Sequence, residues 1–207
     1  MPPLFYEVTM IYVIDDLMPE DEAIQFSERF FSDPYWQANW NRGLSDTEKR
    51  AWNWHRSPGT DIRDMGLGNT ELTPEAEDLW YYVGKQIAAH FNDVPHLPTR
   101  YYANSHTYGV DGPIHRDDGD VTAIYYPCQD WKTDWEGGTA FYNEAIDDCT
   151  RYATYKFNRL VIFKASIPHR AMPVARECYE LRTSIVFKTQ MDTNSPEYAE
   201  WFRKRSN

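Results

Sequence analysis

Short runs of apolar, β-branched and aromatic residues fill the second half of the chain, and turn residues separate them. Each run has the length and the residue types that favour a strand. A similar run lies near the N-terminus. The pattern therefore predicts six strands, over residues 5–14, 100–109, 120–126, 138–143, 159–165 and 181–189.

Helix-start signals occur at three places where a proline is followed by acidic residues. They predict helices over residues 20–31, from residue 74 onward, and after Pro196. Along the second of these helices apolar residues recur at helical spacing, at Leu79, Val83, Ile87 and Phe91. Helices followed by many short strands are typical of an α+β fold, in which the strands close into a sandwich or a jelly roll and the N-terminal helices buttress one sheet.

The length of 207 residues corresponds to one domain. Within it we expect a helical and loop-rich N-terminal part over 1–99, a jelly-roll core over 100–190 and a C-terminal helix over 191–207. Residues 32–72 have no regular pattern and are rich in tryptophan. A long irregular stretch inside a compact domain is more often functional than idle.

Charge narrows the classes of partner. The chain has 21 basic and 32 acidic residues and a net charge of −11. Nucleic-acid and anionic-membrane surfaces need clustered basic residues, so we expect neither partner. No apolar run approaches the ~18–20 residues that span a bilayer. Three widely spaced cysteines and an N-terminus without signal-peptide features favour a cytoplasmic location.

The candidate chemistry begins with His115-Arg116-Asp117, the one histidine in this chain that is followed two residues later by a carboxylate. On a strand these two side chains share a face and could reach one metal ion. His169, after an apolar strand, could add the third ligand of a two-histidine, one-carboxylate site for Fe(II). The alternatives are an ordinary ion pair for His115 and Asp117, and a strand-end histidine bonded to the backbone for His169.

Arg182 follows His169 by thirteen residues and shares a strand face with Ser184. A buried guanidinium beside a hydroxyl suits one end of a dicarboxylate. The alternatives are that Arg182 is a surface residue paired with a carboxylate, or that Arg176 performs this role.

Several further motifs occur in the same order as in a known family. Tyr108-Gly109 precedes the His-x-Asp triplet, and Glu136-Gly137-Gly138-Thr139 leads into Phe141. An Arg159-Leu160-Val161-Ile162-Phe163 strand precedes Pro168-His169. Over roughly 108–188 the chain resembles the Fe(II)/2-oxoglutarate-dependent oxygenases, specifically the prolyl-hydroxylase-like branch that includes the hypoxia-inducible-factor prolyl hydroxylases.

The resemblance implies a double-stranded β-helix core and an enzyme that uses Fe(II), 2-oxoglutarate and O2, with ascorbate as a further reductant. It implies His115, Asp117 and His169 as the metal ligands, with no catalytic residue beyond them. The residues that it implies for 2-oxoglutarate are Arg182, Tyr126, Tyr108, Ser184 and His106. The expected reaction is hydroxylation of an unactivated C–H bond, with succinate and CO2 as co-products.

The substrate would be a prolyl residue of a peptide or a small amino-acid-like molecule, and the acidic net charge favours one that is neutral or cationic. Candidate substrate residues are Trp52, Trp54, Arg56, Tyr102 and Asn104, with Arg63 as a weaker one. A buried tryptophan pair is the alternative for residues 52 and 54. Two other functions stay open at this point: a cupin-like metal-binding β-barrel without 2-oxoglutarate chemistry, and a binding module that keeps an inactive triad.

Overall fold

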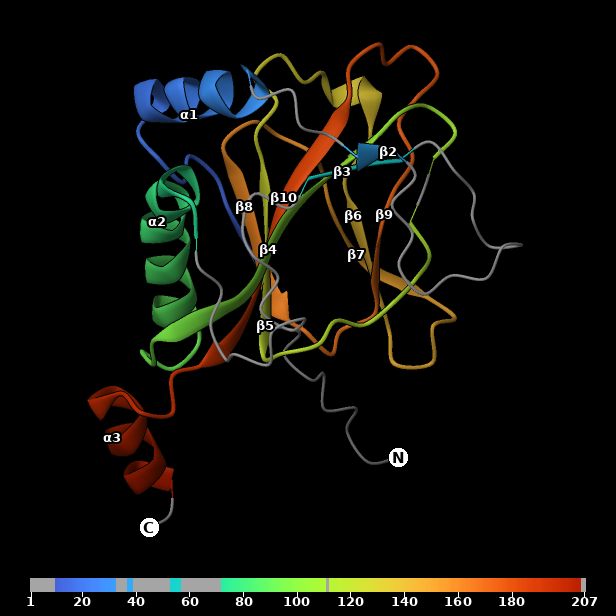
Figure 1. The fold of residues 1–207 in the computed structure, drawn as a ribbon. Coiled ribbons are helices and arrows are strands. Elements are labelled where there is room, and N and C mark those ends of the chain that lie inside the picture. Colours follow the sequence, from blue (N-terminus) through green and yellow to red (C-terminus); the bar gives the residue numbers. More distant parts are fainter. Residues whose placement is uncertain (1–9, 33–36, 39–52, 57–71, 111, 206–207) are drawn as a thin grey trace.

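Two antiparallel sheets face each other in the computed structural model, which describes residues 10–32, 37–38, 53–56, 72–110 and 112–205 (Figure 1). The larger sheet has the strand order β1 (Ile11–Ile14), β8 (Arg159–Lys164), β5 (Val121–Tyr126), β10 (Arg182–Met191), β4 (His96–His106), β3 (Asn53–Arg56) and β2 (Gln37–Ala38). The smaller sheet has the order β7 (Cys149–Ala153), β6 (Thr139–Tyr142) and β9 (His169–Ala171).

Helices α1 (Glu20–Ser32) and α2 (Pro74–His90) cover the outer face of the larger sheet (Figure 1). Helix α3 (Pro196–Arg205) follows β10 along the chain. Helix α2 begins as the sequence predicts, because the Thr73 hydroxyl accepts the Ala76 N–H at 3.3 Å and Pro74 occupies the first turn. No helix in the described part of the chain is both long enough and apolar enough to cross a membrane.

Alternate residues of the central strands supply two separate cores. Tyr125 points outward and packs with Phe26 of α1 and Leu79 of α2 in the helix-side core. Its neighbours Ile124 and Tyr126 point inward and belong to the core between the two sheets. Both faces of the larger sheet are therefore covered. Polar side chains on its inner face are removed from water and need specific partners.

The α+β fold with a jelly-roll core is confirmed, and four strands were not predicted. β7 is missed because four of its five residues are exposed, and β9 because it has three residues. β2 and β3 lie in the stretch 32–72 that shows no pattern, most of which is outside the described residues.

The boundaries of two predicted strands also differ. β4 was predicted over 100–109 and instead runs from His96 to His106, so its first residues include Pro98, which lowers strand propensity. The pairing with β10 accommodates this proline by an irregularity between Lys188 and Thr189. Of the predicted strand 5–14, only residues from Met10 onward are described, and β1 begins at Ile11.

Candidate functional site

The two histidines of the candidate triad are neighbours across a pair of backbone hydrogen bonds. His115 forms an isolated antiparallel bridge with His169, the first residue of β9. The His115 N–H donates to the His169 carbonyl at 3.0 Å, and the His169 N–H donates back at 2.9 Å. The imidazole centroids consequently lie 4.4 Å apart. The Asp117 N–H donates to the Ala165 carbonyl at 2.9 Å, which fixes the triplet beside the turn after β8.

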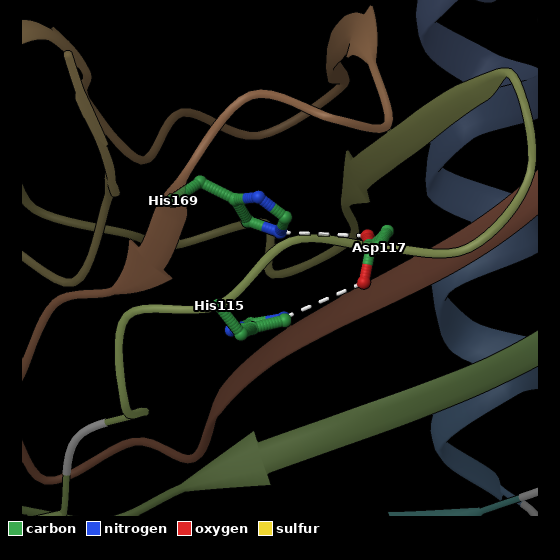
Figure 2. Close-up of side chains that lie close together, drawn as sticks. All are labelled: His115, Asp117 and His169. Carbon is green, nitrogen blue, oxygen red and sulfur yellow. Dashed lines mark ion pairs between the residues drawn. The ribbon is translucent and has the colours of Figure 1, made fainter. Parts of the chain in front are cut away.

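The carboxylate of Asp117 lies beside the two imidazoles and faces the Nε2 atom of each ring (Figure 2). Its Oδ1 is 3.5 Å from His115 Nε2, and its Oδ2 is 3.4 Å from His169 Nε2. The Nδ1 atoms donate to the carbonyls of Pro113 and Ile167, each at 2.9 Å. These bonds orient both rings so that Nε2 faces the carboxylate. One ligand atom from each residue lies within 4.8 Å of the others, so the three can hold a metal ion.

The metal-facing carboxylate is buried and ionised. The Asp117 side chain is 2% exposed, Thr122 Oγ1 donates to its Oδ2 at 2.8 Å, and Lys188 Nζ lies 2.8 Å from its Oδ1. Burial raises the pKa of Asp117, but hydrogen bonds from the two histidines and the charge of Lys188 outweigh burial and hold that pKa well below its usual range. Burial lowers the pKa of His115, its contact with Asp117 raises it, and the net shift is upward. Metal binding here would therefore release protons.

The donor set fits Fe(II). Two imidazole nitrogens and one carboxylate on one side of an ion leave adjacent coordination positions for a co-substrate and for dioxygen. The carbonyl partners of both Nδ1 atoms are the outer-shell contacts that such imidazole ligands require. His115, Asp117 and His169 are the three residues that were predicted as ligands from the sequence.

A second polar cluster surrounds Arg182 at the start of β10. The side chain is 1% exposed. Its Nε donates to the Gly137 carbonyl at 2.6 Å, and its Nη1 donates to Ser184 Oγ at 3.1 Å. The guanidinium carbon lies 5.9 Å from the ring centroids of both Tyr126 and Tyr155. These contacts leave guanidinium donors for an anionic ligand, as a carboxylate anchor requires.

Tyr126 and His106 complete this cluster. The Tyr126 hydroxyl and Thr139 Oγ1 are hydrogen-bonded at 2.7 Å. His106 pairs with Arg182 across the β4–β10 register. Burial, together with the charge of Arg182, lowers the pKa of His106 to about 3, so its ring is neutral. Its Nδ1 is buried and has no hydrogen-bond partner among the described residues.

Tyr108 differs from the other predicted co-substrate residues in lying outside the strands and at the surface. β4 ends at His106, and the Tyr108 side chain is 59% exposed in the following turn. Arg176, the alternative anchor, is exposed in the segment before β10. Arg182, by contrast, is among the largest fully buried side chains of the described residues.

Two of the predicted substrate residues lie beside these groups. Tyr102 and Asn104 alternate with buried residues on β4 and pair with Val186 and Ser184 of β10. Trp54 and Arg56 belong to β3, where the register pairs them with Ser105 and Ala103. The other predicted residues of this region, Trp52 and Arg63, lie outside the described residues.

The sequence analysis missed Lys188, which contacts the metal-facing carboxylate. Lys188 lies six residues after Arg182 on the same strand, so both side chains share one face of β10. A lysine at an even spacing from a candidate anchor, inside the apolar run of β10, was the available signal.

Gly138 supports the anchor by allowing a close approach of backbone. A Cβ at this position would overlap the carbonyl oxygen of Ala153 and would lie 2.8 Å from the Tyr152 ring. We expect Gly138→Ala to destabilise the protein by about 1–3 kcal/mol through overpacking. We also expect it to weaken 2-oxoglutarate binding, because the preceding Gly137 carbonyl holds Arg182. Urea unfolding and a binding titration measure the two effects.

Gly112→Ala is the matched control, since a Cβ there meets the backbone and side chain of Ala171 at ordinary distances of 3.5 Å and above. The control should change the free energy of unfolding by less than about 0.5 kcal/mol. Equal stability of the two variants would contradict the proposed close packing at Gly138.

Two facing antiparallel sheets with a two-histidine, one-carboxylate cluster are the architecture of a jelly-roll protein that can hold one metal ion. The family model described as the 2OG-Fe(II) oxygenase superfamily matches residues 80–187, which is more than half of the chain. The chain belongs to this superfamily, and its cofactors are Fe(II) and 2-oxoglutarate. Among functionally curated proteins, none matches the sequence significantly.

Solved structures with the same fold include two prolyl hydroxylases and a protein with 2-oxoglutarate and hygromycin B bound. A Trichoplax adhaerens prolyl hydroxylase in complex with a hypoxia-inducible-factor peptide has a TM-score of 0.61 and 18% identity, covering 93% of this chain and 87% of that one. A Pseudomonas putida prolyl-4-hydroxylase gives 0.58 and 15%, covering 87% and 93%. HygX from Streptomyces hygroscopicus, with nickel, 2-oxoglutarate and hygromycin B bound, gives 0.57 and 10%, covering 87% and 83%. These likenesses show the fold.

Proposed function

We propose that the protein is a dioxygenase that hydroxylates an unactivated C–H bond of a prolyl residue in a peptide or of a small amino-acid-like molecule. The observation that carries this proposal is the cluster of His115, Asp117 and His169, together with the buried guanidinium of Arg182 on β10. The match to the oxygenase superfamily favours this proposal over a cupin-like metal protein, which needs no buried anchor for a dicarboxylate.

Each group in the site has a distinct task. His115 and His169 would bind Fe(II) through Nε2, and Asp117 through its carboxylate. When bound, the iron supplies the redox chemistry that uses O2 and 2-oxoglutarate, releases succinate and CO2, and hydroxylates the substrate. The chain's own residues position the reactants and exclude competing reactions.

Arg182 would bind the distal carboxylate of 2-oxoglutarate, with the hydroxyls of Ser184 and Tyr126 beside it. Arg182 and Lys188 share one face of β10, so a dicarboxylate held by Arg182 would lie on the same face of the sheet as the lysine that contacts Asp117. His106, being neutral, can donate a hydrogen bond to the co-substrate without adding charge.

Tyr102 and Asn104 are the described residues that we assign to the substrate side, because they share β4 with His106 and pair with the anchor strand. The preference for a prolyl substrate rests on the motifs of the sequence and on the prolyl hydroxylases among the structures with this fold. A peptide bearing a proline and a free amino acid are therefore the two substrate classes to compare.

An anaerobic titration tests the proposal. Fe(II) is added to the metal-free protein, and 2-oxoglutarate is then added while the visible spectrum is recorded. We expect a weak charge-transfer band that appears only when both are present, and succinate and CO2 after oxygen is admitted. A protein that binds Fe(II) but gives neither the band nor succinate would contradict the proposed reaction.

A further inference from the structure

Lys188 is a buried cation that bridges two carboxylates. Its side chain is 8% exposed, and its Nζ lies 2.8 Å from Asp117 Oδ1 and 3.0 Å from Asp118 Oδ1. The two carboxylates differ in environment, since the Asp117 side chain is 2% exposed and that of Asp118 is 51% exposed. One partner of Lys188 is thus a candidate metal ligand, and the other reaches solvent.

The bridging geometry keeps Lys188 charged in the interior. Two carboxylate oxygens lie within 3.0 Å of Nζ, and two such neighbours favour the charged form of a buried amine. The ammonium group therefore neutralises the buried carboxylate while no metal is bound. A buried Asp117 without this partner would be an uncompensated charge, which is strongly destabilising.

We propose that Lys188 is the internal counter-ion of the metal site. When Asp117 binds a metal ion, Asp118 remains as the carboxylate that balances the charge of Lys188. Lys188 then acts as a positioning residue for the carboxylate ligand. This inference rests on the metal site of the proposed function and adds the residues that set its charge.

Coulomb's law gives the two partners opposite effects on metal affinity. The ammonium group repels a divalent cation that approaches Asp117, so removing its charge strengthens metal binding. The Asp118 carboxylate offsets that repulsion, so removing its charge weakens metal binding. A residue that only supports the fold would not produce effects of opposite sign.

The experiment is a calorimetric titration of the metal-free protein with Co(II) at neutral pH, without 2-oxoglutarate. Lys188→Met keeps most of the side-chain volume and loses the charge, and we expect it to bind Co(II) about tenfold more tightly because the repulsion between the ammonium group and the metal ion is removed. Lys188→Arg keeps the charge and, for the same reason, should stay within about threefold of the wild type.

Asp118→Asn tests the second half of the inference on a half-exposed residue whose replacement leaves the core intact. We expect a weakening of about three- to tenfold, less than for the buried lysine because solvent screens the exposed carboxylate. In a Lys188→Met background the same substitution should have a smaller effect, since the double-mutant cycle isolates the coupling between the two residues.

Thermal unfolding gives a readout that does not depend on affinity alone. Lys188→Met should lower the melting temperature of the metal-free protein and enlarge the increase that Co(II) produces. Equal or weaker Co(II) binding by folded Lys188→Met, or unchanged binding by Asp118→Asn, would overturn the inference. Failure of the wild type to bind Co(II) would instead refute the proposed metal site, so the two failures are distinguishable.

Discussion

Asp117→Ala is expected to weaken divalent-metal binding by at least about a hundredfold, because loss of a ligand exceeds the 10–100-fold effect of losing an outer-shell partner. The carboxylate contacts both imidazoles and is the sole anionic member of the candidate triad. Without it, two imidazole rings remain beside the cation Lys188, and this charge opposes a divalent ion. Formation of succinate from 2-oxoglutarate should fall to the background without enzyme. Calorimetry with Co(II) and proton NMR of succinate measure the two effects.

Asp148→Ala is the matched control for this prediction. Asp148 is an exposed carboxylate in the β6–β7 connection, and the same truncation there removes equal charge and volume away from the metal site. We expect wild-type metal affinity and succinate yield from the control. Full turnover by Asp117→Ala would remove Asp117 from the ligand set, and equal losses in both variants would point to a general effect of charge.

The fold was predictable where buried positions give the sequence a regular spacing of apolar residues. Helix α2 carries both a cap at Thr73 and a buried stripe, and its predicted start agrees with the structure. β7 carries no such pattern because it lies at the edge of the smaller sheet and exposes most of its side chains. Its pairing with β6 depends on tertiary contacts that alternation of residue types does not encode.

The site was predictable where the chemistry is specific to a residue type. His115 and Asp117 were selected by their spacing on an expected strand, whereas the structure gives His115 a single bridge outside the named strands. Their convergence with His169 therefore comes from the backbone pairing of these two histidines. The order of the motifs along the chain predicted that His169 joins His115 and Asp117, whereas the local spacing of residues did not.

Lys188 shows why part of the site was missed. Lys164 and Lys188 both lie toward the ends of apolar strands, and the sequence around each one predicts a strand. Lys164 is exposed, whereas Lys188 is buried because the segment of Asp117 and Asp118 lies against its end. Which lysine is buried depends on a contact about 70 residues away along the chain, and in the sequence only the even spacing of Lys188 from Arg182 points to it.

Arg182→Met is expected to weaken 2-oxoglutarate binding by at least about a hundredfold, since each hydrogen bond to a charged group contributes roughly 1.5–3 kcal/mol and a carboxylate can accept two from the guanidinium. Methionine retains much of the apolar stem but supplies neither charge nor donors. Co(II) affinity should stay within about threefold of the wild type, because the triad residues are unchanged. The measurement is a titration of Co(II)-loaded protein with 2-oxoglutarate.

The same substitution leaves the Gly137 carbonyl without its partner, which costs about 1–3 kcal/mol of stability. Unfolding curves measure this loss of stability separately from the loss of binding. Arg182→Lys also lacks the planar fork but keeps the charge, so it should bind 2-oxoglutarate with intermediate affinity. Arg176→Met provides the contrast, since this exposed arginine was the alternative anchor. Loss of 2-oxoglutarate binding in Arg176→Met, with wild-type affinity in Arg182→Met, would transfer the anchor to Arg176. Loss of binding in Arg182→Met, with wild-type affinity in Arg176→Met, would assign the buried guanidinium to the distal carboxylate. A protein with an acidic net charge needs such a local cation to bind a dianion.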